Sequence, residues 1–244
     1  MGTSRTKVIT KLRSVVRGKS WTRARIIRIC GLLLVLGFVL DLALLPTGRE
    51  FLLKNPESTA LIEEKGAEAA RDERQIRHEQ RWVPLARIAP SLKRAVIVAE
   101  DGAFYDHRGF DTAELKKVLR ESWAKGQFPR GASTISQQLA KNLYLSSSKN
   151  PFRKLREAII TLHLERNLTK SRILELYLNV IEWGDGIYGA EAAAQFYFKK
   201  SAQELGASEA AFLAAIIPNP VGAYNPQKHP RRVRRKQAII LSRM

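Results

Sequence analysis

A long apolar run near the amino terminus is the strongest hydrophobic signal in the chain. Between residues 29 and 45 every side chain is apolar or glycine except Asp41, and Ile26 and Ile27 extend the run past Arg28. A run of about 20 residues spans the hydrocarbon layer of a bilayer. The long Arg28 side chain can reach the head groups, and Asp41 lies near the other end of the run. We therefore expect a transmembrane anchor at residues 29–45.

The residues before this run set the expected topology. The first 28 residues contain nine basic and no acidic side chains, and positively charged flanks stay in the cytoplasm. We expect a basic cytoplasmic tail at residues 1–28 and all of residues 46–244 across the membrane. A cleaved signal peptide fits less well, because the leader is long and residues 43–47 offer a poor cleavage site. A buried core helix would need a partner for the Asp41 carboxylate.

The pattern after the anchor changes from polar to helical. Residues 46–81 are polar and charged, and we expect them to form a connector. Residues 82–244 are expected to form one domain in which apolar residues recur at helical spacing. Leu92, Ala95, Val96 and Ala99 mark the buried face of a first helix, with Ser91 as its expected N-cap.

Capping residues and apolar spacing predict further helices. Thr134 and Gln137 have the spacing of a capping box at the start of a helix that runs to about Leu143. A third helix carries an apolar stripe, expected to be buried, that leaves Glu157 off the buried face; the stripe consists of Phe152, Leu155, Ile159 and Leu162. No long alternating strand pattern occurs between residues 85 and 217. The predicted fold is therefore mainly α.

The net charge of +19 narrows the class of partner. Residues 46–244 alone hold 33 basic and 22 acidic side chains. This excess favours an anionic partner, which is nucleic acid, phospholipid head groups or a substrate that bears pyrophosphate. The single cysteine, Cys30, excludes an intrachain disulfide.

Glu100 and Asp101 form the first candidate chemical site. A Glu-Asp pair at a helix end is by default a solvated terminus. Glu100, however, closes an apolar helix face, and a partly buried carboxylate there suits a general base that removes a proton from a hydroxyl. Glu100 is therefore the candidate base, with Asp101 beside it.

Two later segments supply amides, hydroxyls and cations. A helix that opens at Ser133 and Thr134 offers free N–H groups and the positive end of its dipole to an anion, although a capped surface helix explains these two residues equally well. Gln138, Lys141 and Asn142 lie about one turn apart on that helix, where they would line a groove for phosphates and sugar amides. Farther on, Arg153 and Glu157 are spaced as an ordinary surface ion pair.

These segments resemble the motifs of the membrane-bound peptidoglycan glycosyltransferases, a lysozyme-like family shared with the amino-terminal domains of bifunctional penicillin-binding proteins. The matching patterns occur in the family's order between about residues 82 and 226. They are Glu100-Asp101-x-x-Phe104-x-x-His107-x-Gly109, Gly131-x-Ser133-Thr134-Ile135-x-Gln137-Gln138-x-x-Lys141-Asn142, Arg153-Lys154-x-x-Glu157, Lys170-x-x-Ile173-Leu174-Glu175-x-Tyr177-Leu178-Asn179, and Tyr188-Gly189 with Ala192-Ala193 and Tyr197-Phe198.

The resemblance implies roles for individual residues. It implies Glu100 and Glu157 as catalytic residues, with Glu100 as the general base and Glu157 positioning a donor pyrophosphate, through Mg²⁺ or Mn²⁺ as the expected divalent cation. No organic cofactor is expected. At Lys149 the family more often has arginine, which grips phosphate in a bidentate manner. The implied substrate-binding residues are Asp101, Ser133, Thr134, Gln138, Lys141, Asn142, Lys149, Arg153, Lys154 and Arg156.

The resemblance also implies a function and a location. The enzyme would polymerise lipid II in an inverting reaction that forms β-1,4 bonds and releases undecaprenyl pyrophosphate. It would sit in the bacterial cytoplasmic membrane as a single-pass protein whose catalytic domain is periplasmic or extracellular. The expected partners are lipid II, the nascent glycan strand, membrane lipids and other cell-wall synthesis proteins, and no nucleic acid. A transpeptidase domain is not expected, because the sequence has no Lys-Thr-Gly.

Two other functions remain open at this point. A lysozyme-like muramidase or lytic transglycosylase also uses a glutamate in an α-rich fold, but a neutral glycan does not require Lys141, Lys149 or Arg153. A non-catalytic, basic, membrane-anchored binding protein or division scaffold is supported only by the positive charge, and the chain shows no nucleic-acid-binding motif.

Overall fold

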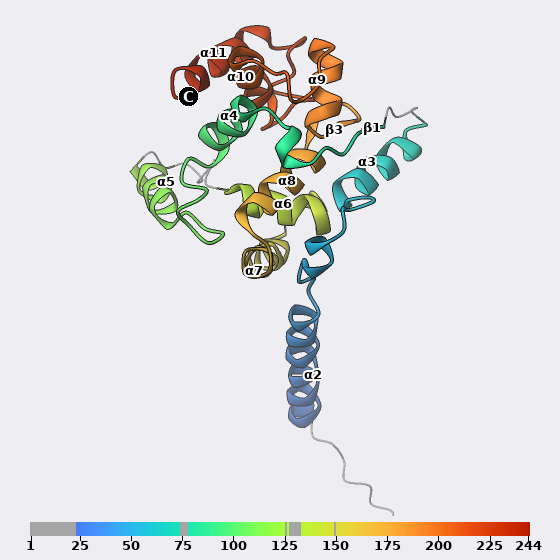
Figure 1. Ribbon diagram of the computed structural model, residues 1–244. Helices are drawn as coiled ribbons and strands as arrows, with labels where there is room; N and C mark the ends of the chain where they lie inside the picture. Colours follow the sequence, from blue (N-terminus) through green and yellow to red (C-terminus); the bar gives the residue numbers. More distant parts are fainter. Residues whose placement is uncertain (1–22, 74–77, 125, 127–132, 149) are drawn as a thin grey trace, which may run out of the picture. The chain divides into compact units, whose positions relative to one another are not determined.

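The computed structural model describes residues 23–73, 78–124, 126, 133–148 and 150–244 (Figure 1). The chain divides into two compact units, residues 1–45 and residues 46–244. The first contains helix α2 (Arg23–Ala43). Its segment Arg25–Ala43 has a mean hydropathy of 2.4 and is long and apolar enough to cross a membrane. The expected span of residues 29–45 therefore falls mostly within one helix, which starts earlier because Arg28 does not interrupt helical hydrogen bonding.

The second unit is mainly helical, which confirms the predicted fold class. Its elements are η1 (Arg49–Leu52), α3 (Ala60–Arg71), β1 (Glu79–Gln80), η2 (Leu85–Arg87), α4 (Pro90–Glu100), α5 (Thr112–Ala124), α6 (Ile135–Tyr144), α7 (Pro151–Asn167), α8 (Lys170–Val180), β2 (Glu182–Gly184), β3 (Ile187–Tyr188), α9 (Ala190–Phe198), α10 (Ala207–Ile216) and α11 (Pro230–Leu241).

The core of this unit contains two groups of packed helices. Helix α6 packs between α7 and α8, and α10 packs against both α4 and α11 (Figure 1). The central helix α8 is apolar on most sides and fully buries Ile173, Leu176 and Tyr177. Helix α10 is similarly buried from Ala210 to Ile216, except at the half-buried Phe212. These buried helices hold the ends of α4 and α6, which carry the first two motifs.

A small sheet of short strands joins residues 79–80 to residues 182–188. Its order is β1-β3-β2, with β1 parallel and β2 antiparallel to β3. The chain leaves β3 through Gly189, whose φ is +82°. A Cβ at this position would lie 2.7 Å from the carbonyl oxygen of Asn179, so only glycine allows the turn into α9.

The buried face of α7 differs from the predicted one. Phe152 is 62% exposed and Leu162 is 50% exposed, whereas Glu157, Ile160 and Leu164 are buried. The prediction that Glu157 lies off the buried face is therefore wrong. Apolar spacing predicts only that one helix face avoids water. Here the face with Glu157 packs inward, because the carboxylate has cationic partners that offset the cost of burying it.

One of the two predicted N-caps is present and the other is not. The capping box of α6 is present: Thr134 Oγ1 accepts from Gln137 N at 3.2 Å, and Gln137 Oε1 accepts from Thr134 N at 3.0 Å. Helix α4, by contrast, starts at Pro90, so the predicted cap at Ser91 is wrong. The Ser91 hydroxyl instead donates to the carbonyl of Leu205 at 2.6 Å, because the α4 start packs against the loop before α10.

Residues 46–73 and 78–81 are not a free-standing connector. Phe51, Thr59 and Ala69 are buried, and α3 packs on α6. Arg172 of α8 donates to the carbonyls of Phe51 and Lys54, at 2.8 and 2.7 Å. This polar segment is held to the rest of the unit largely by hydrogen bonds, with few apolar anchors.

Glu182 of β2 gives the fold a testable pH dependence. Burial raises the pKa of this carboxyl to about 7, and Asp185 and Glu68 act in the same direction, while Lys65 opposes them. Below about pH 4.5 the Glu182 carboxyl is protonated in both the folded and the unfolded chain, and its contribution to stability is fully present. This contribution is lost as the pH rises through about 7, because the unfolded chain ionises Glu182 more easily than the folded chain does. We expect Glu182→Gln to exceed the wild type in free energy of unfolding by on the order of 2 kcal/mol at pH 8, and to match it near pH 4.5.

Thermal unfolding of both proteins across this pH range measures the effect. An unchanged difference between pH 4.5 and pH 8 would contradict the assignment to Glu182.

Candidate active site

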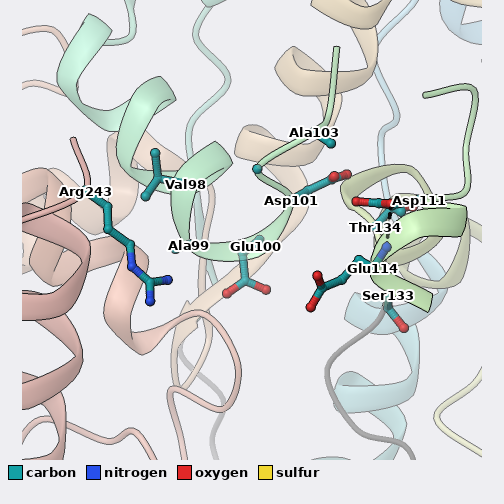
Figure 2. A pocket seen from close by; sticks show the side chains of 11 residues that line it. Val98, Ala99, Glu100, Asp101, Ala103, Asp111, Glu114, Ser133, Thr134 and Arg243 are labelled. Atoms are coloured by element: carbon teal, nitrogen blue, oxygen red, sulfur yellow. Dashed lines mark hydrogen bonds between the residues drawn. The ribbon is translucent and has the colours of Figure 1, made fainter. Parts of the chain in front are cut away.

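Glu100 is the last residue of α4 and lies in an open pocket of about 340 Å³. The pocket is bordered by the starts of α5 and α6 and by Arg243. Figure 2 shows the Glu100 carboxylate pointing into this space, with Arg243 on one side and Glu114 and Ser133 on the other. The carboxylate is thus placed where a substrate hydroxyl has access to it.

Hydrogen bonds fix the orientation of Glu100. Gln138 Nε2 of α6 donates to Glu100 Oε2 at 3.0 Å. Tyr177 of α8 donates its hydroxyl to Gln138 Oε1 at 2.9 Å. Complete burial raises the pKa of Tyr177 far above its usual value, and Glu100 and Asp101 add to this effect. Tyr177 therefore remains a neutral donor, which turns the Gln138 amide so that its N–H faces Glu100.

A cation from the carboxyl-terminal helix completes this arrangement. Lys236 Nζ of α11 lies 3.4 Å from Glu100 Oε1 and 5.2 Å from the centroid of the Tyr224 ring. Glu100 is therefore held by a neutral donor on one oxygen and by a cation on the other. A carboxylate held in this way is ready to receive a proton at a defined position.

Asp101 lies beneath the pocket surface. Its side chain is only 1% exposed. Oδ1 pairs with His107 Nε2 at 2.9 Å, and Oδ2 accepts from Ile135 N, the first residue of α6, at 2.9 Å. Asp101 thus joins the first motif to the helix of the second. Its carboxylate occupies an N–H group at the positive end of α6 that was expected to serve a substrate anion.

Ser133 and Thr134 have different surroundings. Ser133 is exposed and lines the pocket, whereas Thr134 is buried. The Thr134 hydroxyl donates to the carbonyl of Gly109 at 2.7 Å while it caps α6. Thr134 therefore holds the α6 start against the first motif, and Ser133 is the hydroxyl that faces the pocket.

A second cluster forms around Glu157 of α7. Arg153 Nη1 lies 2.7 Å from Glu157 Oε2, and Lys154 Nζ pairs with Oε1. Burial lowers the pKa of Lys141, and Glu157 opposes this shift more strongly than any other single charge. Gln138 and Lys141 lie on the same helix, so α6 serves both the Glu100 pocket and this cationic cluster.

Three other residues were expected at the site, and they are Asn142, Lys149 and Arg156. Asn142 is buried beside Lys141 in sequence, and Arg156 of α7 is half-buried. Lys149 lies outside the described residues. Arg153 also donates from Nε to the carbonyl of Ser148 at 2.5 Å, which ties α7 to the loop that follows α6.

The donor atoms near Glu157 do not form a metal site by themselves. Within the described part of the chain, no group of three or more His, Cys, Asp or Glu side chains is placed to hold a metal ion. Both Glu157 oxygens are bonded to cations. A divalent ion would need most of its oxygen ligands from substrate phosphates.

Sequence reasoning missed three residues of the Glu100 site. Lys236 and Arg243 come from a carboxyl-terminal segment that has no acidic residue after Glu209, and this charge bias was a usable signal. Tyr177 belongs to a matched motif, but nothing in the sequence around it indicates that its hydroxyl orients Gln138.

The geometry agrees with what this chain resembles among known proteins. The family model described as "Transglycosylase" matches residues 67–244. A biosynthetic peptidoglycan transglycosylase of Dechloromonas aromatica is 50% identical over 190 residues, which are 78% of this chain and 82% of the relative. Proteins of the same name from Chromobacterium violaceum and Aromatoleum aromaticum are 47% and 52% identical, over 78% and 72% of this chain and 83% and 76% of their own lengths. The chain therefore belongs to the transglycosylase family.

Proposed function

We propose that this protein polymerises peptidoglycan glycan strands from lipid II. The observation that carries the proposal is the placement of Glu100, which faces an open pocket while one helix, α6, connects it to a cluster of cations. A base and a set of cations that contact the same helix suit a sugar transfer in which the leaving group is a pyrophosphate.

In the proposed reaction, Glu100 takes the proton from the GlcNAc 4-hydroxyl of the acceptor lipid II. The hydroxyl oxygen attacks the anomeric carbon of the lipid-linked donor as the bond to pyrophosphate breaks. Attack from the opposite face converts the α-linked donor into a β-1,4 bond. Lys141, Arg153 and Lys154 compensate the charge that develops on the leaving undecaprenyl pyrophosphate, and Glu100 afterwards loses its proton to solvent.

The other site residues have supporting roles in this proposal. Asp101 and Thr134 position the start of α6, because their polar atoms are bonded within the protein. Ser133 faces the substrate from the pocket wall, and Glu157 holds Arg153 and Lys154 in place. Lys149, Asn142 and Arg156 contribute to donor binding. Mg²⁺ or Mn²⁺ would act together with the donor phosphates.

We further propose that α2 anchors the enzyme in the bacterial cytoplasmic membrane, with its amino terminus in the cytoplasm and residues 46–244 on the other side. Its length and hydropathy support a single span. In the second unit, Leu53 and Trp123 are almost fully exposed, and exposed apolar side chains of this kind suit contact with lipid.

Incubation of the detergent-solubilised chain with labelled lipid II and Mg²⁺, followed by muramidase digestion of any polymer, tests the function. We expect polymer that muramidase degrades, and a parallel reaction with EDTA tests the divalent cation. Release of fragments from purified cell walls without consumption of lipid II would assign the protein to hydrolytic enzymes instead.

A further inference from the structure

Helix α3 contacts the loop that joins the second and third motifs. Its Glu64 carboxylate accepts from the Ser147 backbone N–H at 2.8 Å through Oε2 and from the Ser147 hydroxyl at 2.7 Å through Oε1. Hydrogen bonds from a backbone N–H and a hydroxyl to a carboxylate are stronger than neutral ones. Glu64 therefore restrains this loop from a segment that precedes all the motifs.

The restrained loop leads directly to the cationic cluster. The carbonyl of Ser148, the next residue, accepts from Arg153 Nε at 2.5 Å. Arg153 in turn contacts Glu157 at 2.7 Å. A continuous series of polar contacts thus runs from α3 through the loop to the residues proposed to face the donor pyrophosphate.

A second acidic residue of the same segment restrains the end of α6. Glu50 of η1 accepts a hydrogen bond from the Tyr144 hydroxyl. Burial, followed by this hydrogen bond, raises the pKa of Tyr144 well above its usual value, so Tyr144 remains a donor. Glu50 and Glu64 together hold the last residue of α6 and the loop after it.

We propose that Glu64 is a positioning residue for the donor-phosphate site, acting through Ser147 on the loop that orients Arg153. The proposal rests on the proposed function and extends the site to residues 46–73, which the motifs do not include. Its physical basis is preorganisation: a loop already held in its binding conformation loses less conformational entropy when a pyrophosphate binds. The negative charge of Glu64 also favours the cationic form of nearby Lys141.

Steady-state kinetics of the full-length chain with lipid II test this role. We expect Glu64→Ala to raise KM for lipid II about tenfold and to change kcat less than twofold, because Glu64 bonds to Ser147, whereas Gln138 and Lys236 hold the base. Inhibition by undecaprenyl pyrophosphate should weaken by a similar factor. Glu63→Ala is the matched control, since Glu63 is an exposed neighbour on the same helix, and it should retain wild-type KM and inhibition.

A double-mutant cycle separates positioning from a general loss of folding. Ser147→Ala removes the hydroxyl bond and keeps the backbone bond, so its effect on KM should be smaller. The Glu64→Ala/Ser147→Ala pair should be no worse than Glu64→Ala alone. Equal KM in Glu64→Ala and the wild type, or fully additive effects in the cycle, would overturn the proposal. If the wild type forms no polymer, the proposed function fails; if it does and Glu64→Ala is normal, only this inference fails.

Discussion

Replacement of Glu100 by glutamine should lower the kcat of lipid II polymerisation by about a thousandfold, with little change in KM. A positioned general base contributes on the order of 10²–10⁴ to a rate. Glutamine keeps the size of the side chain and can still accept a hydrogen bond from Gln138, but it takes up no proton. Initial rates of polymer formation from labelled lipid II measure this loss.

Glu114→Gln provides the matched control. Glu114 lines the same pocket (Figure 2), and its carboxylate pairs with Lys117 of its own helix. It should reduce kcat less than threefold. Equal losses in the Glu100 and Glu114 variants would indicate that the charge of the pocket matters and that neither carboxylate is the base. Wild-type kcat in Glu100→Gln would remove Glu100 from the mechanism.

Replacement of Asp101 by asparagine should destabilise the fold by about 3 kcal/mol, since it breaks a buried pair and leaves a buried donor without an acceptor. Both Asp101 oxygens accept from groups inside the protein, His107 and the first N–H of α6. Asparagine can accept from only one of them in the same place. The midpoint of thermal unfolding in detergent should fall by several degrees.

Asp106→Asn is the comparison for this measurement, because Asp106 is an exposed acid in the same loop. Its effect should stay within about 0.5 kcal/mol, as is usual for exposed positions. An Asp101 variant as stable as the Asp106 variant would show that the bonds of Asp101 do not hold the two motifs together.

The helices were more predictable than the faces they bury. Periodicity located α7, but its apolar stripe is largely exposed and the polar face with Glu157 is buried. A stripe of apolar residues has the same pattern whether it meets a protein core or another apolar surface. The burial of Glu157 depends on its pairing with Arg153 and Lys154. From spacing alone, Arg153 and Glu157 were expected to form an ordinary surface ion pair.

The sequence by itself determined the features that depend on near neighbours in the chain. These are the apolar helix near the amino terminus, the mainly α fold, the capping box at Thr134 and the family to which the chain belongs. Each follows from hydrogen bonds or side-chain periodicity within a few residues, or from motifs whose internal spacing is short.

Only the tertiary structure decided the contacts between distant segments. Lys236 meets Glu100 across 136 residues, Glu64 meets Ser147 across 83, and Asp101 meets the start of α6 across 34. A basic or acidic side chain on a helix is compatible with many partners, and its sequence context does not select one. The packing of α3, α6 and α11 selects it, because buried polar groups must find hydrogen-bond partners wherever the core brings them together.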